Sequence, residues 1–176
     1  IPTFTDLFYS DKTTLGNDNL KPEEANTQEI GIRFSKARVT ASLAYFSRKS
    51  KNLIDFVKNS NDASIPFRAE NIQQVNTNGI NLELMHYISF NTLTHQIKIN
   101  YSYLENNLVN NGYNFSRYTI NNDLKHHLVG SYNWPITQNL NTYFVYKYVE
   151  RTSGDAYTVV DASARWTVAS FEISLY

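Results

Sequence analysis

The sequence predicts an all-β protein whose antiparallel strands run up and down beside one another in the wall of a barrel. Three observations support this fold class. Apolar and polar residues alternate with a period of two, as in residues 94–105, where Ile97 and Ile99 alternate with Lys98 and Asn100. Tyrosine and threonine, which favour strands, are abundant, and no sustained 3.6-residue helical pattern is found. The links that connect these predicted strands also alternate between short and long.

The alternation predicts eight strands. Their expected ranges are 25–34, 39–55, 71–88, 94–105, 123–134, 140–151, 157–166 and 171–176. Tight turns are expected at 35–38, 89–93, 135–139 and 167–170, and longer links rich in Asn, Ser and Gly at 56–70, 106–122 and 152–156. A meander with tight turns at one end and long loops at the other is the organisation of a transmembrane β-barrel.

Composition excludes several classes of protein. The 176 residues fit one domain, and 16 basic against 16 acidic side chains give a formal net charge of zero, so nucleic acid is not an expected partner. No apolar run approaches the roughly 20 residues of a transmembrane helix. Cysteine is absent, which excludes disulfides and thiolate nucleophiles. The start at Ile1, without Met or a signal segment, indicates a piece of a longer, processed polypeptide.

The sequence contains no recognisable catalytic arrangement. Its four histidines lie singly or as the pair His126 and His127, and adjacent strand residues point to opposite faces, so this pair cannot chelate one metal ion. Neither a nucleophile elbow nor a Gly-rich phosphate loop is present. We therefore expect no enzyme activity, no catalytic residue, no cofactor and no metal site.

Charged residues separate from aliphatic ones across the predicted strands. The charges that fall opposite the aliphatic row are Glu29, Arg33, Glu83, Lys98, Lys125, Asp161, Arg165 and Glu172. A Lys or Arg that faces lipid at the bilayer midplane costs about 2–4 kcal/mol, so a membrane strand requires this separation. His86 and His126 fall on the apolar row, and the phase of the strand that contains Lys147 is ambiguous.

Alternation alone does not say which face points outward, because a soluble sandwich alternates equally well with its apolar row inside. Aromatic residues help to decide, because they gather toward the strand ends on the apolar row. They are Tyr101, Tyr103, Tyr132, Trp134, Tyr146, Tyr148 and Trp166. Two aromatic rows at two membrane interfaces would produce this pattern, whereas aromatic packing in a soluble β-core is the alternative.

Several segments resemble TonB-dependent outer-membrane receptors. They are FTDLFY at 4–9, GNDNLKPE at 16–23, QEIGIR at 28–33, VTASLAY at 39–45, NTNGINLE at 76–83, YKYVER at 146–151 and YTVVD at 157–161. The resemblance covers nearly the whole chain and depends on the order and spacing of these segments. It implies the outer membrane of a Gram-negative bacterium, a lipid bilayer as surroundings, and a nutrient transporter coupled to TonB. In the descending strand, Gly79 fits a close backbone approach or a bulge.

The resemblance also implies that residues 1–176 are eight strands from the later part of one barrel domain of about 22 strands. Residues 1–24 would form an extracellular loop, and the plug domain and the final strands would lie outside the sequence. Within the family, cobalamin receptors are most similar, through NLKPE at 19–23, LID at 53–55 and LTHQI at 93–97. Siderophore and haem-iron receptors share much of this framework and are the alternative.

Ligand contacts in such a receptor are expected from long loops and from the upper parts of inward-facing rows. The candidate ligand-binding residues are Tyr9, Asn61, Phe67, Arg68, Tyr113, Phe115, Tyr118, Arg151 and Tyr157. Expected partners are TonB, through the plug, and cobalamin or an iron chelate, with a surface lipoprotein as a further candidate. The charged row would face the plug.

Two other classes of protein remain open from the residues alone. One is a complete eight-stranded outer-membrane barrel with a structural or adhesive role, which would have a mature mass near the 20.3 kDa of this chain. The other is a soluble β-sandwich that binds a ligand such as a carbohydrate, which would be soluble without detergent.

Overall fold

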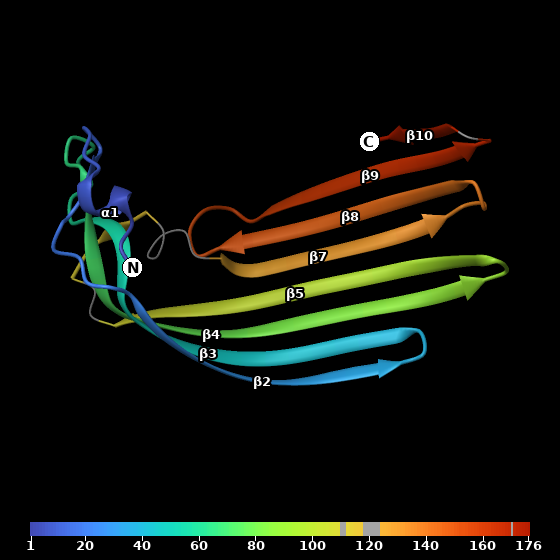
Figure 1. The fold of residues 1–176 in the computed structure, drawn as a ribbon, viewed down its shortest axis with the longest axis horizontal. Helices are drawn as coiled ribbons and strands as arrows, with labels where there is room; N and C mark the ends of the chain where they lie inside the picture. Colours follow the sequence, from blue (N-terminus) through green and yellow to red (C-terminus); the bar gives the residue numbers. More distant parts are fainter. Residues whose placement is uncertain (110–111, 118–123, 170) are drawn as a thin grey trace.

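The computed structural model describes residues 1–109, 112–117, 124–169 and 171–176. Eight long strands form one sheet in the order β10-β9-β8-β7-β5-β4-β3-β2 (Figure 1). They are β2 (Glu24–Lys36), β3 (Val39–Lys58), β4 (Phe67–Phe90), β5 (Leu93–Val109), β7 (Leu124–Pro135), β8 (Leu140–Arg151), β9 (Tyr157–Val168) and β10 (Phe171–Leu175). Each pairs antiparallel with its neighbours. The predicted fold class and the predicted strands are confirmed.

Three strands extend further toward the loop end than the sequence predicts. The expected links at 56–70 and 106–122 are partly strand, because β3 continues to Lys58, β4 begins at Phe67 and β5 continues to Val109. Strict alternation is lost at the ends of β3 and β5, where Phe56 and Val57, and again Leu108 and Val109, are adjacent apolar residues, although the backbone pairing continues. Three short elements were also not predicted: α1 (Phe4–Phe8), β1 (Thr14–Leu15) and β6 (Phe115–Ser116). Among the described residues no helix has the length and apolar content needed to cross a membrane.

The tight turns lie together at one end of the sheet, opposite the long loops (Figure 1). Three of them contain a residue other than glycine with positive φ: Ala37 at 46°, Asn91 at 53° and Ala169 at 51°. Two-residue hairpins favour such a conformation because its twist matches the twist of the flanking strands. The positions of these turns agree with those expected from the sequence.

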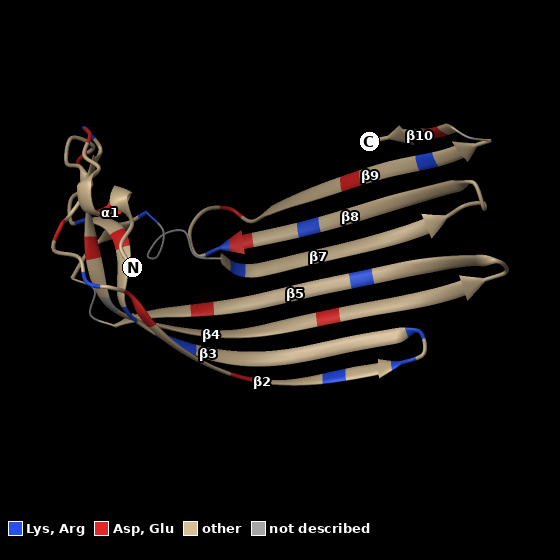
Figure 2. Ribbon diagram, in the orientation of Figure 1, with Lys and Arg blue, Asp and Glu red and all other residues tan. Residues whose placement is uncertain are grey.

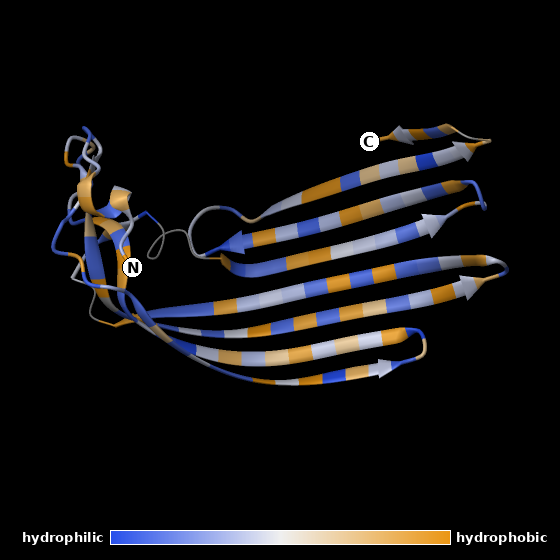
Figure 3. Cartoon of the chain, viewed as in Figure 1, coloured by the Kyte–Doolittle hydropathy of each residue, from blue (hydrophilic) through white to orange (hydrophobic). Residues whose placement is uncertain are grey.

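The strand register separates the two faces of the sheet. One row contains Ile32, Leu43, Leu82, Tyr101, Leu128 and Tyr148 in register across six strands. The adjacent row on the opposite face contains Arg33, Ser42, Glu83, Asn100, Val129 and Lys147. Figure 3 shows the resulting alternation of apolar and polar positions along each strand, and Figure 2 shows only isolated charged positions there.

Lys147 lies on the polar face, which settles the phase of β8. Its Nζ atom is 3.6 Å from Oδ2 of Asp161 on β9. On the other face Ile32 and Val160 are 72% and 68% exposed, and the described residues form no second layer that covers them. A soluble sandwich would bury these side chains, so the apolar face is the outward, lipid-facing one.

The apolar face ends abruptly at a boundary row near the loop end. This row consists of Ile30, Tyr45, Ile80, Tyr103 and His126. The next row of the same face is polar and consists of Gln28, Ser47, Asn78 and Glu105. His126 belongs at this boundary, where its Nδ1 is 2.8 Å from the hydroxyl of Tyr101.

A second aromatic row lies near the tight turns. His95 stacks on Tyr132, Tyr132 on Trp134, and Trp134 contacts Phe144, with ring centroids 5.9 to 6.3 Å apart. From His95 to Tyr103 a strand rises by about 26 Å, or about 20 Å of height at a tilt of about 40°, which fits an apolar band about 25 Å tall. The boundary row and this aromatic row therefore mark the two membrane interfaces.

Beyond the boundary row, β3 and β4 leave the direction of the other strands (Figure 1). There β1 pairs in parallel with β4, and β6 pairs with β3. We call residues 1–20, 53–72 and 112–117 the cap, and the rest of the sheet the wall. Val57 and Ile72, almost fully buried in the cap, pack with Val75 at its base, against Leu53, Leu108 and Tyr113. The cap thus has a small hydrophobic core of its own.

Gly79 allows a close approach on the polar face of the wall. Its position is buried, and a β-carbon added there would collide with the ring of Phe46 on β3. An aromatic ring that covers a strand glycine shields backbone that would otherwise lack packing. The register runs through Gly79 without a shift, so the position holds no bulge, and the close approach there is made chiefly by the ring of Phe46.

Candidate functional site

The cap is organised around the ring of Phe67, the first residue of β4. Lys58 Nζ lies 4.7 Å from the ring centroid and Arg117 Cζ lies 4.9 Å from it. Arg117 also lies 5.4 Å from the ring of Phe56. Each such contact between a cation and an aromatic ring is worth about 0.5–1 kcal/mol at an exposed site. Two positive charges are therefore held beside one aromatic surface.

Arg117 joins three segments that are distant in the sequence. Its Nη2 donates to the backbone oxygen of Thr13 at 3.1 Å and to Oγ1 of Thr14 at 2.9 Å. Its backbone N–H donates to the carbonyl of Phe56 at 3.1 Å. Lys58 is fixed by donating to the carbonyl of Asp62 at 3.0 Å. The two cations are thus held by the cap itself.

Glu70 pairs with a third cation of the cap, Arg68. Its Oε1 lies 3.2 Å from Nε of Arg68, and its Oε2 accepts a hydrogen bond of 3.3 Å from the buried Asn17. Asn17 also donates to the carbonyl of Ala69 at 3.0 Å. Burial, and then the negative charge of Glu70, raise the pKa of Tyr113 above the usual value for tyrosine.

The N-terminal segment is ordered by local hydrogen bonds. Thr3 and Asp6 form a capping box at the start of α1. Asp11 accepts from the backbone N–H and the hydroxyl of Thr13, at 2.7 and 2.9 Å, and from the hydroxyl of Tyr9 at 3.0 Å. Hydrogen bonds from Thr13 and Tyr9 favour the carboxylate and lower the pKa of Asp11 to about 2, and the bond to Asp11 raises the pKa of Tyr9.

The structure brings most of the candidate ligand-binding residues into the cap. Phe67 and Arg68 begin β4, Tyr113 packs on the hydrophobic core, and Phe115 lies in β6 opposite Lys58. Tyr9 accepts a hydrogen bond of 2.7 Å at its carbonyl from Gly16, and Asn61 lies exposed between β3 and β4. The candidate Tyr118 lies outside the described residues.

Arg151 and Tyr157 lie elsewhere, at the two ends of the loop between β8 and β9. A hollow of about 480 Å³ at this loop is lined by Arg151, Glu150 and Lys125 among others. Lys125 sits at a register shift of β7, where its Nζ lies 3.5 Å from Oε1 of Glu150. The candidate residues therefore form two groups rather than one cluster.

Sequence reasoning missed Arg117, Lys58 and Asn17. Arg117 had a detectable signal, because it is the only basic residue in the link at 106–122 and stands between two aromatic residues, Phe115 and Tyr118. Nothing local marks Asn17, whose hydrogen bonds reach Ala69, 52 positions away. In the described part of the chain, no group of three or more His, Cys, Asp or Glu residues is placed to bind a metal ion.

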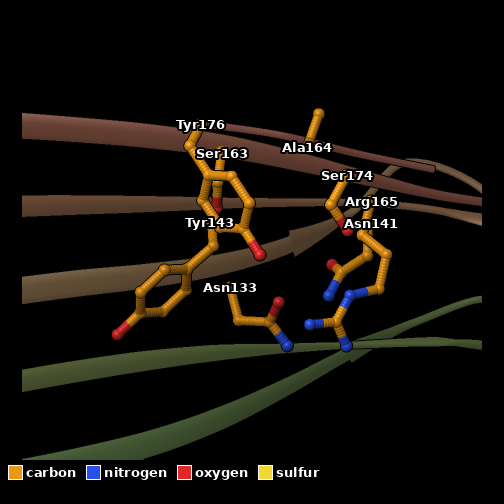
Figure 4. Close-up of a pocket in the computed structure, with 8 residues that line it drawn as sticks. All are labelled: Asn133, Asn141, Tyr143, Ser163, Ala164, Arg165, Ser174 and Tyr176. Atoms are coloured by element: carbon orange, nitrogen blue, oxygen red, sulfur yellow. The ribbon is translucent and has the colours of Figure 1, made fainter. Parts of the chain in front are cut away.

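A further hollow, of about 350 Å³, lies on the polar face near the tight turns (Figure 4). Its polar lining includes Asn133, Asn141, Tyr143 and Arg165. Arg165 pairs with Glu172 at 3.3 Å. Oδ1 of Asn141 is buried and has no hydrogen-bond partner among the described residues. A buried amide oxygen of this kind favours a donor from a segment packed on this face.

The sheet has one layer, and its outward apolar band lies between the boundary row and the aromatic row near the tight turns. This arrangement defines part of an outer-membrane β-barrel. The family model described as "TonB dependent receptor-like, beta-barrel" matches residues 1–176, and the chain belongs to this family. The family consists of outer-membrane transport receptors of Gram-negative bacteria, so the predicted location is confirmed.

Solved structures share this fold at low identity. The siderophore receptor PirA from Pseudomonas aeruginosa is 20% identical with a TM-score of 0.66, over 96% of this chain and 28% of PirA. The copper transporter OprC is 13% identical with a TM-score of 0.71, over 98% and 28%. The pyoverdine receptor FpvA from P. aeruginosa PAO1 is 19% identical with a TM-score of 0.59, over 95% and 26%.

The chain thus spans about a quarter of the length of these proteins. A search of curated proteins found no match. The family predicted from the sequence motifs is confirmed, whereas specificity for cobalamin is not shown by any of these comparisons.

Proposed function

We propose that this chain forms part of the wall and capture surface of a receptor that imports an iron–siderophore complex across the outer membrane. The observation that carries the proposal is the position of Lys58 and Arg117 beside the ring of Phe67 at the extracellular end, where Arg68 follows Phe67 in β4. Positive charges beside an aromatic surface suit an anionic, ring-containing chelate. A siderophore receptor, a ferric enterobactin receptor and a pyoverdine receptor have the same fold, which supports this substrate class.

Cobalamin is the second candidate ligand. The sequence motifs at 19–23, 53–55 and 93–97 favour it. The first two of these segments contribute to the cap, whereas the third belongs to the turn end of β5. Cobalamin carries little net charge, so its binding would depend weakly on Arg68 and on salt.

Energy for import would come through TonB and a plug domain, because the outer membrane has no ATP supply. We propose that the polar face of the wall contacts this plug. The hollow at Asn141 and Arg165 supports the proposal, since a plug segment that donates to Oδ1 of Asn141 would satisfy that buried atom (Figure 4).

A surface lipoprotein is a further proposed partner. Phe4 and Phe8 of α1 are 77% and 59% exposed, with ring centroids 5.3 Å apart. Exposed aromatic pairs of this kind are favoured at protein interfaces.

Ligand titration of the full-length receptor by calorimetry tests the substrate class. We expect a ferric siderophore to bind with an affinity that falls with salt, and Arg68→Gln to weaken binding by about tenfold, or 1.4 kcal/mol. The matched control is Lys36→Gln at a tight turn, which should leave affinity unchanged. Salt-independent binding of cobalamin alone would establish the second candidate, and binding of neither ligand would overturn both.

A further inference from the structure

The apolar face of the wall is interrupted at Gly130 in β7. In the register Gly130 stands between Ile99 of β5 and Tyr146 of β8. A β-carbon added to Gly130 would have no heavy atom within 4 Å, so the missing side chain leaves open space. A notch of about 280 Å³ lies there.

The notch is formed entirely by strands that are present in the wall. Ile97, Tyr132, Phe144 and Val160 are among the residues that line it, together with the two neighbours of Gly130. The lining belongs to β5, β7, β8 and β9, and each of these strands is paired on both sides. No additional strand is therefore needed to form its walls.

The position of Gly130 places the notch in the hydrocarbon region. Gly130 is four residues from His126 of the boundary row and four from Trp134 of the aromatic row near the tight turns. The notch is continuous with the lipid-facing surface on either side. At this depth the abundant partner is an acyl chain of the bilayer.

Polar groups lie at the turn end of the notch. The hydroxyl of Tyr132 is 2.9 Å from Nδ1 of His95, and Tyr132 stacks on Trp134. Short turns of such barrels face the periplasm, so this end lies in the periplasmic leaflet. Rings of this kind prefer the level of the lipid head groups.

We propose that the Gly130 notch is a binding site for one phospholipid of the periplasmic leaflet. An acyl chain lies in the notch between Ile99 and Tyr146, and the head group lies beside His95, Tyr132 and Trp134. The inference is independent of the imported ligand and concerns the outer surface of the barrel.

Native mass spectrometry of the full-length receptor after detergent exchange tests this site. The wild type should retain one phospholipid per barrel, Gly130→Ala should retain less, and Gly130→Leu should lose it at least tenfold. Ala162→Leu is the matched control, because Ala162 lies exposed on the same face and does not line the notch. Resistance of the folded barrel to SDS at room temperature verifies that each variant has assembled.

Equal phospholipid retention in the wild type and in Gly130→Leu would overturn the proposal. So would a receptor dimer that forms in the wild type and is lost in Gly130→Leu, because the notch would then belong to an interface between two copies. Retention by Gly130→Ala that matches Gly130→Leu, with Ala162→Leu equally depleted, would show only general loss of lipid and would also contradict a specific site.

Discussion

The wall and the cap share the strands β3 and β4 but are stabilised in different ways. In the wall, residues such as Ile32 and Val160 remain largely exposed, and the backbone ladder joins neighbouring strands. In the cap, Ile72 and Val57 are buried, and charged side chains make specific contacts. A strand can thus belong to a lipid-solvated sheet over one part of its length and to a water-soluble fold over the next.

The largest difference between the regions should appear on truncation of a buried side chain of the cap. Ile72 is 0% exposed, so Ile72→Ala should destabilise the cap by about 2–5 kcal/mol through lost burial and a cavity. Hydrogen exchange of cap amides measures this, and wall amides should keep their protection. The control Ile65→Ala, at a side chain that is 43% exposed, should change exchange little. Equal loss of protection in wall and cap would contradict two separately stabilised regions.

The wall should instead be sensitive to charge on its outward face. Ile99→Arg should reduce the free energy of unfolding in lipid vesicles by about 2–4 kcal/mol, because the cation would face hydrocarbon. Asn100→Arg changes the adjacent residue, which points to the polar face, and should cost less than about 1 kcal/mol. Urea titration of both variants checks the orientation of the sheet, which would be wrong if Asn100→Arg were the more damaging.

A smaller effect is expected from the cation that joins the segments of the cap. Arg117→Ala removes two hydrogen bonds to Thr13 and Thr14 and two aromatic contacts, so the cap should lose about 2 kcal/mol. Arg117→Lys should restore only part of this, since an ammonium lacks the planar fork. Exchange of the Thr14 and Leu15 amides measures the release of β1. Arg38→Ala, in a tight turn, is the control.

The smallest effect is a dependence of the stability of the cap on pH. The pKa of Asp11 is lowered from 3.8 to about 2 by hydrogen bonds from Thr13 and Tyr9. Because the folded pKa is lower than the unfolded one, the stabilisation is present above about pH 4 and is lost as pH falls through about 2. A carbon NMR titration of the Asp11 carboxyl group measures this, and a midpoint near 3.8 would contradict the hydrogen-bonded geometry. In Asp11→Asn, exchange of the Thr13 amide should no longer change over this range.

The wall could be predicted from the sequence because its physical signal is local. Alternation at Ile97, Lys98 and Ile99 requires only that one face meets lipid and the other does not. The signal ends at the boundary row, where residues such as Asn78 and Glu105 face water on the outer side as well. The strand ends at 56–58 and 106–109 were missed because adjacent apolar residues break the alternation there, and the four residues at 67–70 were assigned to the adjoining link.

The cap could be predicted only in part. Phe67, Arg68, Tyr113 and Phe115 could be assigned to the loop end because aromatic and charged residues differ from the Asn, Ser and Gly of the long links. Their arrangement could not be predicted, because Arg117 is fixed by residues more than 100 positions earlier and no local pattern encodes that contact.

The bonds that join Arg117 to Thr13 and Thr14 at β1 bear on the order in which the protein assembles. Wall hairpins join neighbouring stretches of chain, whereas the bonds from Arg117 to Thr13 and Thr14 span 104 and 103 positions. Contacts between such distant positions form slowly, since a long loop must close first. We therefore expect the cap to be the last part to mature, after the strands on which it stands have entered the bilayer.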